Sequence, residues 1–172
     1  MKNKILVSVV MGSDSDLHQM KGCMEILEFF KVPFEVTITS AHRSPEKTGL
    51  YAKGLVKKGV RVIIAGAGGS AHLAGVIASL TTIPVIGVPM GTKTLSGVDS
   101  LYSIVQMPKG IPVATVAIGE TGAYNAGVLA VEILALEDIK LKKELNLYKK
   151  NLEKNVSEKD AKLQKVGYKK YV

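Results

Sequence analysis

The sequence is poor in cysteine and in aromatic residues: it has one cysteine, no tryptophan, three phenylalanines and six tyrosines. A single thiol, Cys23, cannot form a disulfide within the chain, and no cysteine or histidine cluster has the spacing of a zinc site. No apolar run approaches the about 20 residues needed to span a bilayer. The first apolar run is short, and polar residues 12–16 follow it at once, unlike a secretory signal. We therefore expect a cytoplasmic protein with no membrane partner and no bound metal.

Positive charge is concentrated near the C-terminus. The formal net charge is +8, and residues 137–172 contain eleven lysines and six acidic residues (11 − 6 = +5), which leaves +3 for residues 1–136. A nucleic-acid-binding protein is expected to interleave basic residues with base-reading or stacking side chains, and the body of this chain does not. The basic segment is more typical of a solvated helix surface, so we expect no nucleic-acid partner.

The chain is rich in Gly, Ala, Val and Ile, which is typical of a buried parallel sheet with helices packed closely on it. Apolar β-branched runs predict strands, and apolar residues at helical spacing predict helices between them. The expected strands are residues 4–11, 34–39, 60–65, 84–88 and 113–117. The expected helices are residues 15–31, 45–58, 71–80, 98–106 and 123–136. This alternation predicts an α/β fold, and length and strand count favour a flavodoxin-like three-layer α/β/α sandwich with a parallel sheet.

The end of the chain is a separate part of this prediction. Residues 137–172 carry one apolar stripe at helical spacing, formed by Leu141, Leu145, Tyr148 and Leu152. We expect a C-terminal helical extension that packs on its own domain or on a neighbouring subunit, after a catalytic domain of residues 1–136.

Three segments of small and polar residues follow the first three expected strands, at residues 12–16, 40–45 and 66–72. Ligands of a parallel sheet bind at the carboxyl ends of its strands, so these segments are expected to form one pocket. The first segment offers two hydroxyls, two carboxylates and a helix N-terminus, which suits a phosphate or ribose hydroxyls. The alternative is that Ser13 or Asp14 only caps the helix.

The second and third segments contain the ionisable groups. Arg43 suits a bidentate grip on phosphate, and His42 can exchange protons near neutral pH; a surface salt bridge and a structural turn histidine are the alternatives. The glycines of residues 66–72 let a ligand approach the backbone, and His72 faces the same pocket unless it is a satisfied interior histidine. This loop also matches a G-x-G-x-x-A dinucleotide fingerprint, but Ile86 stands where an acidic residue is expected. His18 is expected to be an exposed bystander.

Five motifs together resemble the N5-carboxyaminoimidazole ribonucleotide mutase (PurE) family, which supplies the catalytic subunit of phosphoribosylaminoimidazole carboxylase. They are MGSDSD (11–16), SAHRSP (40–45), AGAGGSAHLAG (65–75), PVIGVP (84–89) and DSLYSIVQMPKGIPVATVAIG (99–119). The resemblance implies a flavodoxin-like fold, octamers with active sites at subunit junctions, and no cofactor. The GAGG-S-AHL run and SIVQMPKGIP look like the mutase branch rather than the branch that carboxylates with CO2 directly. Ala74, residues 90–92 and residues 121–125 depart from the mutase pattern.

The resemblance also implies roles for particular residues. Ser13, Asp16 and Arg43 would bind the ribonucleotide, with Ser15 and Ser40 beside Arg43 at the phosphate and Asp16 at the ribose. His42 would transfer the proton, and His72, its neighbour in the pocket, is grouped with it among the catalytic residues. Gly69 and Leu73 would also bind the substrate. CO2 would be a transient intermediate, and an ATP-dependent synthetase would make the substrate.

The chemistry implied is a decarboxylation followed by recarboxylation at C4. Protonated His42 would give a proton to the nitrogen that loses CO2, and neutral His42 would later take the proton from C4. Three other readings stay open: direct carboxylation with CO2, a flavodoxin-like nucleotide-binding module without catalysis, and a nicotinamide or flavin oxidoreductase based on the glycine-rich loop.

Overall fold

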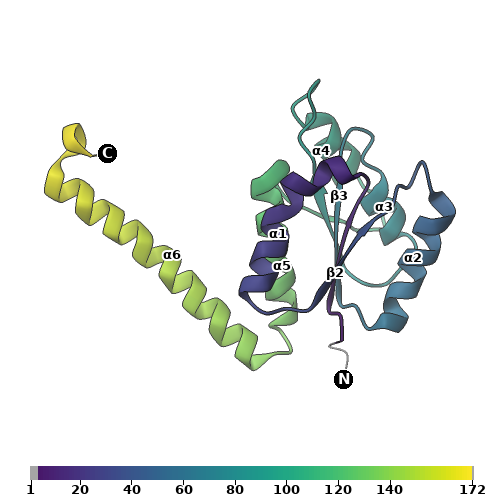
Figure 1. Cartoon of the computed structure of the whole chain (residues 1–172), viewed down its shortest axis with the longest axis horizontal. Helices are drawn as coiled ribbons and strands as arrows, with labels where there is room; N and C mark the ends of the chain where they lie inside the picture. Colours follow the sequence, from purple (N-terminus) through teal and green to yellow (C-terminus); the bar gives the residue numbers. More distant parts are fainter. Residues whose placement is uncertain (1–3, 172) are drawn as a thin grey trace. The chain divides into compact units, whose positions relative to one another are not determined.

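The structure is a computed structural model that describes residues 4–171. These residues form a five-stranded parallel sheet in the order β2-β1-β3-β4-β5 (Figure 1). The strands are β1 (Val7–Met11), β2 (Phe34–Ile38), β3 (Val62–Ala67), β4 (Val85–Pro89) and β5 (Ala114–Thr115). The helices are α1 (Leu17–Phe29), α2 (Pro45–Lys58), α3 (Leu73–Ala78), α4 (Val98–Val105), α5 (Gly119–Leu134) and α6 (Ile139–Val166). The flavodoxin-like sandwich predicted from the sequence is confirmed.

Local signals set the bounds of several helices. Pro45 opens α2 at a position where its missing N–H costs nothing, and Gly59 ends that helix in the left-handed conformation with φ +81°. The first helix is shorter than predicted, because residues 14–16 form a 3-10 turn and Lys31 reverses the chain with φ 55°. Helix α5 starts four residues earlier than predicted, at Gly119, whose φ of +71° allows the turn out of β5.

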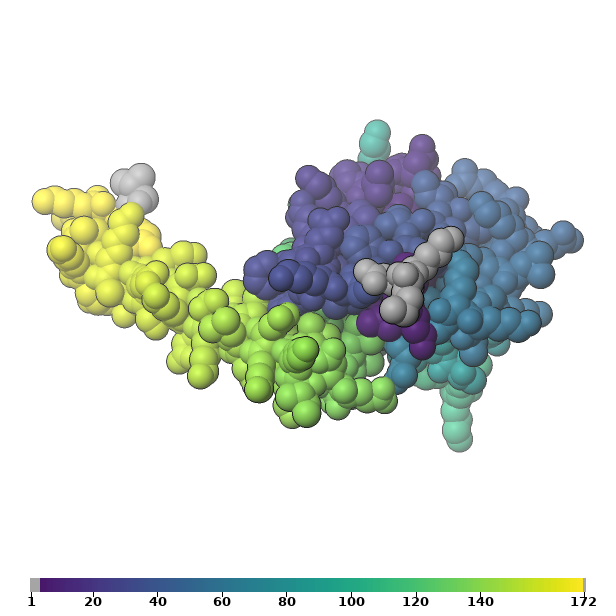
Figure 2. All heavy atoms as spheres, turned by 60° about the horizontal axis from the view of Figure 1, so that its bottom comes forward, coloured from purple at the N-terminus to yellow at the C-terminus, as the bar shows by residue number. Residues whose placement is uncertain are grey.

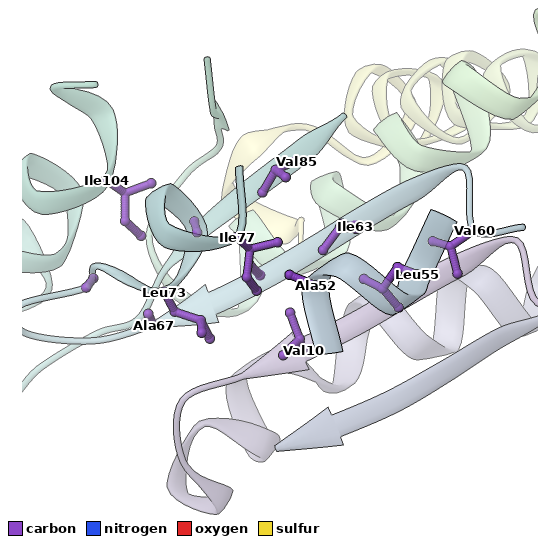
Figure 3. Packing of buried hydrophobic residues seen from close by; sticks show 13 residues of the cluster. Val10, Ala52, Leu55, Val60, Ile63, Ala67, Leu73, Ile77, Val85 and Ile104 are labelled. Atoms are coloured by element: carbon purple, nitrogen blue, oxygen red, sulfur yellow. The ribbon is translucent and has the colours of Figure 1, made fainter. Parts of the chain in front are cut away.

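The two faces of the sheet are covered by different helices. Helices α1 and α5 pack together on one face, and α2 and α3 pack on the other (Figure 1). Side chains alternate accordingly: Val10 and Ile63 belong to the cluster beneath α2 and α3 (Figure 3). Ile77 of α3 and Ile104 of α4 complete that cluster, so α4 lies on this face as well. Burial on both faces explains why the central strands β1 and β3 are apolar at every position except Ser8.

A half-buried tyrosine ties α2 to the sheet. The Tyr51 hydroxyl lies 2.7 Å from Ser8 Oγ in β1 and donates to Glu35 Oε1 in β2 at 2.9 Å. Lys58 donates to the second oxygen of Glu35 at 2.9 Å. Burial raises the pKa of Tyr51, so the phenol keeps its proton and can donate to the carboxylate. These bonds fix the orientation of the helix whose first turn follows His42 and Arg43.

Residues from Ala135 on form a second compact unit, which is described by itself. Asp138 caps α6, because its Oδ1 accepts from the backbone N–H groups of Lys140 at 2.9 Å and Leu141 at 3.1 Å. Gly167 follows the helix with φ +75°. In Figure 2 this helix is coloured from green to yellow. The packing of the extension on a domain or subunit stays a prediction. Within residues 4–171, no helix has both the length and the apolar character needed to cross a membrane.

Candidate active site

The carboxyl ends of β1, β2 and β3 lie at one edge of the sheet, as strand register requires. Met11, the last residue of β1, is paired with Ile38 on one side and Gly66 on the other. The ladder continues just beyond the strand, where Gly12 N–H donates to Gly66 O at 3.2 Å. A cavity of about 460 Å³ opens at this edge. It is lined by Gly12, Ser13, Ser15, Asp16, Ser40, Ala41, His42, Arg43, Ala67, Gly68, Ser70, His72, Leu73, Met90, Gly91 and Thr92.

The first loop turns tightly on its own hydroxyls and carboxylates. Ser13 caps the 3-10 turn, since its Oγ accepts from Ser15 N–H at 3.3 Å and from Ser15 Oγ at 2.9 Å. The capping role considered for Ser13 is therefore real, and it coexists with a position on the cavity wall. Burial raises the pKa of Asp16, against the lowering by hydrogen bonds from Ser13 and Ser15 and by the charges of His18 and Arg43. A half-buried carboxylate in a polar cavity suits hydroxyl donors such as those of a sugar.

The second loop places the guanidinium of Arg43 beside the first loop. Ser40 Oγ accepts from the backbone N–H of Arg43 at 3.1 Å, and Ser44 Oγ donates to Ser40 O at 3.1 Å. Arg43 Nη2 donates to Gly12 O at 3.0 Å, so the guanidinium lies between the two loops. Its other N–H groups suit an anion, and the hydroxyls of Ser15 and Ser40 line the same cavity.

The second and third loops bring two histidines together. His42 Nε2 and His72 Nδ1 are 2.9 Å apart, and the rings meet edge to face with centroids 4.9 Å apart. Both side chains are exposed on the cavity, so His72 is not the interior histidine considered as an alternative. His18 is exposed as predicted, and its Nδ1 lies 2.8 Å from Ser15 O. The cavity therefore presents two imidazole rings within hydrogen-bond distance of each other, those of His42 and His72.

Among the residues predicted to line the site, Gly69 does not line this cavity, whereas its neighbours Gly68 and Ser70 do. The backbone of Gly69, with φ +67°, is turned toward α4 instead. Its N–H donates to Ser100 Oγ at 2.9 Å, and its carbonyl accepts from Ser103 Oγ at 3.1 Å. Gly69 therefore shapes the loop that carries Ser70 and His72. Leu73 is 2% exposed and forms the apolar floor near His72.

Sequence reasoning missed the wall supplied by Met90, Gly91 and Thr92 after β4. The signal was available, because this segment also follows a parallel strand and contains the small residue Gly91 and the polar residue Thr92. Within residues 4–171 there is no group of three or more His, Cys, Asp or Glu side chains placed to hold a metal ion. What the cavity offers is a cation, a carboxylate, several hydroxyls and two imidazoles, which suits an anionic sugar ligand and a proton transfer.

Comparison with known proteins identifies the family. Residues 6–155 match the model of the AIR carboxylase family. The chain belongs to this family. It is 56% identical to N5-carboxyaminoimidazole ribonucleotide mutase of Synechocystis over 97% of this chain and 94% of that protein. It is 54% identical to the Pyrococcus horikoshii protein of the same name, over 98% of this chain and 94% of that protein.

Two further similarities concern a longer enzyme and a solved structure. The chain is 53% identical to phosphoribosylaminoimidazole carboxylase of Candida glabrata, over 98% of this chain but 29% of that protein. The crystal structure of Treponema denticola PurE superposes with a TM-score of 0.84 at 28% identity, over 92% of this chain and 98% of the other. Membership of the family accounts for the fold and for the position of the loops along the chain.

Proposed function

We propose that this chain converts N5-carboxyaminoimidazole ribonucleotide to 4-carboxy-5-aminoimidazole ribonucleotide, a step of purine biosynthesis. The observation that carries the proposal is identity above 50% with proteins named as this mutase, over nearly the whole of both chains. The chemistry of the cavity supports it, because a ribonucleotide with a carboxylate needs an anion site, hydroxyl acceptors and a proton donor in one place.

The substrate's phosphate would lie against Arg43, Ser15 and Ser40. The guanidinium is already oriented by its bond to Gly12 O, so little side-chain entropy is lost when a phosphate binds. Asp16 would accept hydrogen bonds from the ribose hydroxyls, and Ser13 would assist beside it. Ser15 Oγ lies 3.5 Å from Asp16 Oδ1, so the positive charge of Arg43 would offset the repulsion between the phosphate and that carboxylate.

The base would then lie near His42 and His72, where the carboxylate moves. The N–C bond of the carbamate breaks, its electron pair stays on the nitrogen, and a proton from His42 makes that nitrogen an amine. C4 then uses the electrons of the ring to form a bond to CO2, and His42 takes the C4 proton as the ring regains its aromaticity. One proton is given and one is recovered, so a histidine is returned to its starting state.

His72 is placed to assist this shuttle. Its Nδ1 is within hydrogen-bond distance of His42 Nε2, so the two rings can share a proton that leaves for the substrate and returns. The CO2 released between the steps has to be held, and Leu73 beside small residues such as Ala67 and Gly68 provides an apolar surface for it.

A second candidate is direct carboxylation of aminoimidazole ribonucleotide by CO2. It is favoured by the match to fungal proteins named phosphoribosylaminoimidazole carboxylase. This chain corresponds to less than a third of the length of those proteins. An ATP-dependent synthetase that carboxylates the nitrogen would supply the mutase substrate, whereas the carboxylase would need none.

The assembly and the compartment follow from the same proposal. We expect a homo-octamer in the cytoplasm, where the purine precursors are made. Large apolar side chains on the surface of the first unit, such as Phe29 at 64% exposure and Tyr102 at 64%, support burial against other copies.

The deciding experiment follows isomerisation of N5-carboxyaminoimidazole ribonucleotide by absorbance in the absence of ATP and of added bicarbonate. Turnover with the N5-carboxylated substrate, and no comparable product from aminoimidazole ribonucleotide with bicarbonate, would support the mutase. The reverse pattern would establish the carboxylase. Binding of either ribonucleotide without turnover would reduce the chain to a nucleotide-binding module.

A further inference from the structure

The cavity wall after β4 is held in part by the helix that follows it. Ser100 Oγ in α4 donates to Met90 O at 2.7 Å. Asp99 accepts from Thr92 Oγ1 at 2.8 Å, and Thr92 Oγ1 accepts in turn from Gly97 N–H at 3.1 Å. These bonds hold the residues on either side of Gly91. Gly91 itself is held from the opposite direction, by a side chain of α1.

That side chain is Gln19. Gly91 N–H donates to Gln19 Oε1 at 2.7 Å, and Gln19 Nε2 donates to Gly91 O at 3.3 Å. A carboxamide has an acceptor and a donor side by side, so it can pair with both groups of one residue as a neighbouring strand would. The two residues are 72 positions apart, and the pairing therefore joins α1 to the segment after β4.

The space around the amide fits this pairing closely. A Cβ placed on Gly91 would lie 3.3 Å from Gln19 Oε1, and so would a Cβ placed on Gly119. Such contacts are tighter than ordinary van der Waals distance, so a side chain at either glycine would push the amide aside. The carboxamide fits between two glycines that leave it room.

Gln19 does not line the cavity, but both residues that it connects do. Asp16 precedes it by one turn, and Gly91 is its hydrogen-bond partner. We propose that Gln19 is a positioning residue that holds the Gly91 wall at a set distance from Asp16 and so determines affinity for the ribonucleotide. This inference rests on the proposed function, because the ligand is the substrate named there.

Loss of the pairing should change binding rather than chemistry. Gly91 would then be free to leave the position that fits the ligand. The apparent affinity would fall with the fraction of protein molecules in which Gly91 still occupies that position. A molecule that has bound still presents the same His42 and His72 to the base. KM should therefore rise while kcat stays near the wild-type value.

The test compares Gln19→Met, which keeps length and removes both polar atoms, with Gln164→Met on α6 as the matched control. We expect the KM of Gln19→Met for the N5-carboxylated ribonucleotide to rise about tenfold, with kcat within about twofold, as expected when one or two net hydrogen bonds are lost. Deuterium exchange of the segment containing Gly91 should be faster in Gln19→Met. Exchange should be intermediate in Gln19→Glu, which keeps the acceptor for the Gly91 N–H but replaces the donor to Gly91 O with a carboxylate oxygen. Gln164→Met should match the wild type.

Wild-type turnover with an unchanged KM in Gln19→Met would overturn the inference and leave the proposed function standing. A loss in kcat with unchanged KM would also overturn it. A wild-type enzyme that does not isomerise the ribonucleotide would overturn the proposed function, and the inference with it. If Gln19→Met does not fold, Gln19→Ala takes its place, because alanine favours the helix.

Discussion

His42 Nε2 and His72 Nδ1 lie 2.9 Å apart, although the two residues are 30 positions apart in the chain. Two neutral ring nitrogens at this distance share one hydrogen, so the tautomer of one ring sets that of the other. The contact gives a proton a direct path from one ring to the other.

Replacement of His42 by Asn tests the proton transfer. Asn keeps polarity and similar reach, so the fold and ribonucleotide binding should survive. The rate should fall by about 10²–10⁴-fold, the usual effect of losing a general acid–base group. Steady-state turnover and a separate binding titration check this.

His72→Asn is the companion variant. It should lower the rate by less than His42→Asn if, as proposed, His72 acts on the substrate only through His42. Near-wild-type turnover in His42→Asn, with normal binding, would move the proton-transfer role to His72 and leave the family assignment unchanged.

Arg43→Leu should weaken ribonucleotide binding far more than it disturbs folding. The guanidinium spans the first and second loops, and losing a partly desolvated contact to phosphate costs about 2–5 kcal/mol, by analogy with charge pairs at interfaces. Calorimetric titration with the ribonucleotide measures the change. Arg61→Leu, next to the start of β3 at the other end of the sheet, is the matched control. Equal affinities in the two variants would show that Arg43 serves structure.

Asp16→Asn should separate stability from binding. Burial raises the pKa of Asp16 above 3.8, so just above that pH the folded state binds more protons than the unfolded state. The free energy of unfolding of the wild type should therefore fall, relative to the variant, as pH rises through this window, and the difference should level off above it. Denaturant titrations of both proteins between about pH 3.5 and about pH 7 measure this difference in the free energy of unfolding.

The same variant should bind the ribonucleotide about ten- to a hundredfold more weakly, because hydrogen bonds to a charged group contribute about 1.5–3 kcal/mol. A relative stability that rises with pH would contradict the account of Asp16 as a half-buried carboxylate. Unchanged binding would remove its role at the ribose.

Two glycines test the packing of the helices. A Cβ on Gly127 in α5 would overlap Cγ2 of Ile26 in α1 and come within 3.0 Å of the Cys23 carbonyl oxygen. Gly127→Ala should therefore destabilise the fold by about 1–3 kcal/mol. A Cβ on Gly54 in α2 meets nothing within 4 Å, so Gly54→Ala should stabilise it by about 0.5–1 kcal/mol. Thermal unfolding of the two variants should shift in opposite directions; a Gly127→Ala protein as stable as the wild type would contradict the close packing of α1 on α5.

The protein should be a high-order homo-oligomer. Exposed apolar side chains on several elements of the first unit, among them Phe29 and Leu50, are more than a small monomer usually leaves in water. Light scattering coupled to size-exclusion chromatography should give the mass of eight chains. A stable monomer at micromolar concentration would refute this expectation.

The sequence determined the elements and their order, because the signals for these are local. Pro45 and Gly59 set the bounds of α2 within the chain itself, and the apolar runs of β1 and β3 need only a few residues to be recognised. The parallel sheet then required that residues 12–16, 40–45 and 66–72 share one edge. Tertiary structure shortened β5 to two residues, since pairing with β4 at the sheet's edge spans only Ile86 and Gly87.

Only the tertiary structure decided which atoms meet at that edge. The bond between His42 and His72 depends on β1 lying between β2 and β3 in a fixed register. The pairing of Gln19 with Gly91 and the turn of Gly69 toward Ser100 depend on where α1 and α4 pack. Such contacts join residues far apart in the chain, and their geometry is set by the summed packing of the core rather than by any neighbouring residue. A local pattern can therefore predict that a histidine faces the pocket, but the partner of each of its nitrogens is fixed only when the sheet has formed.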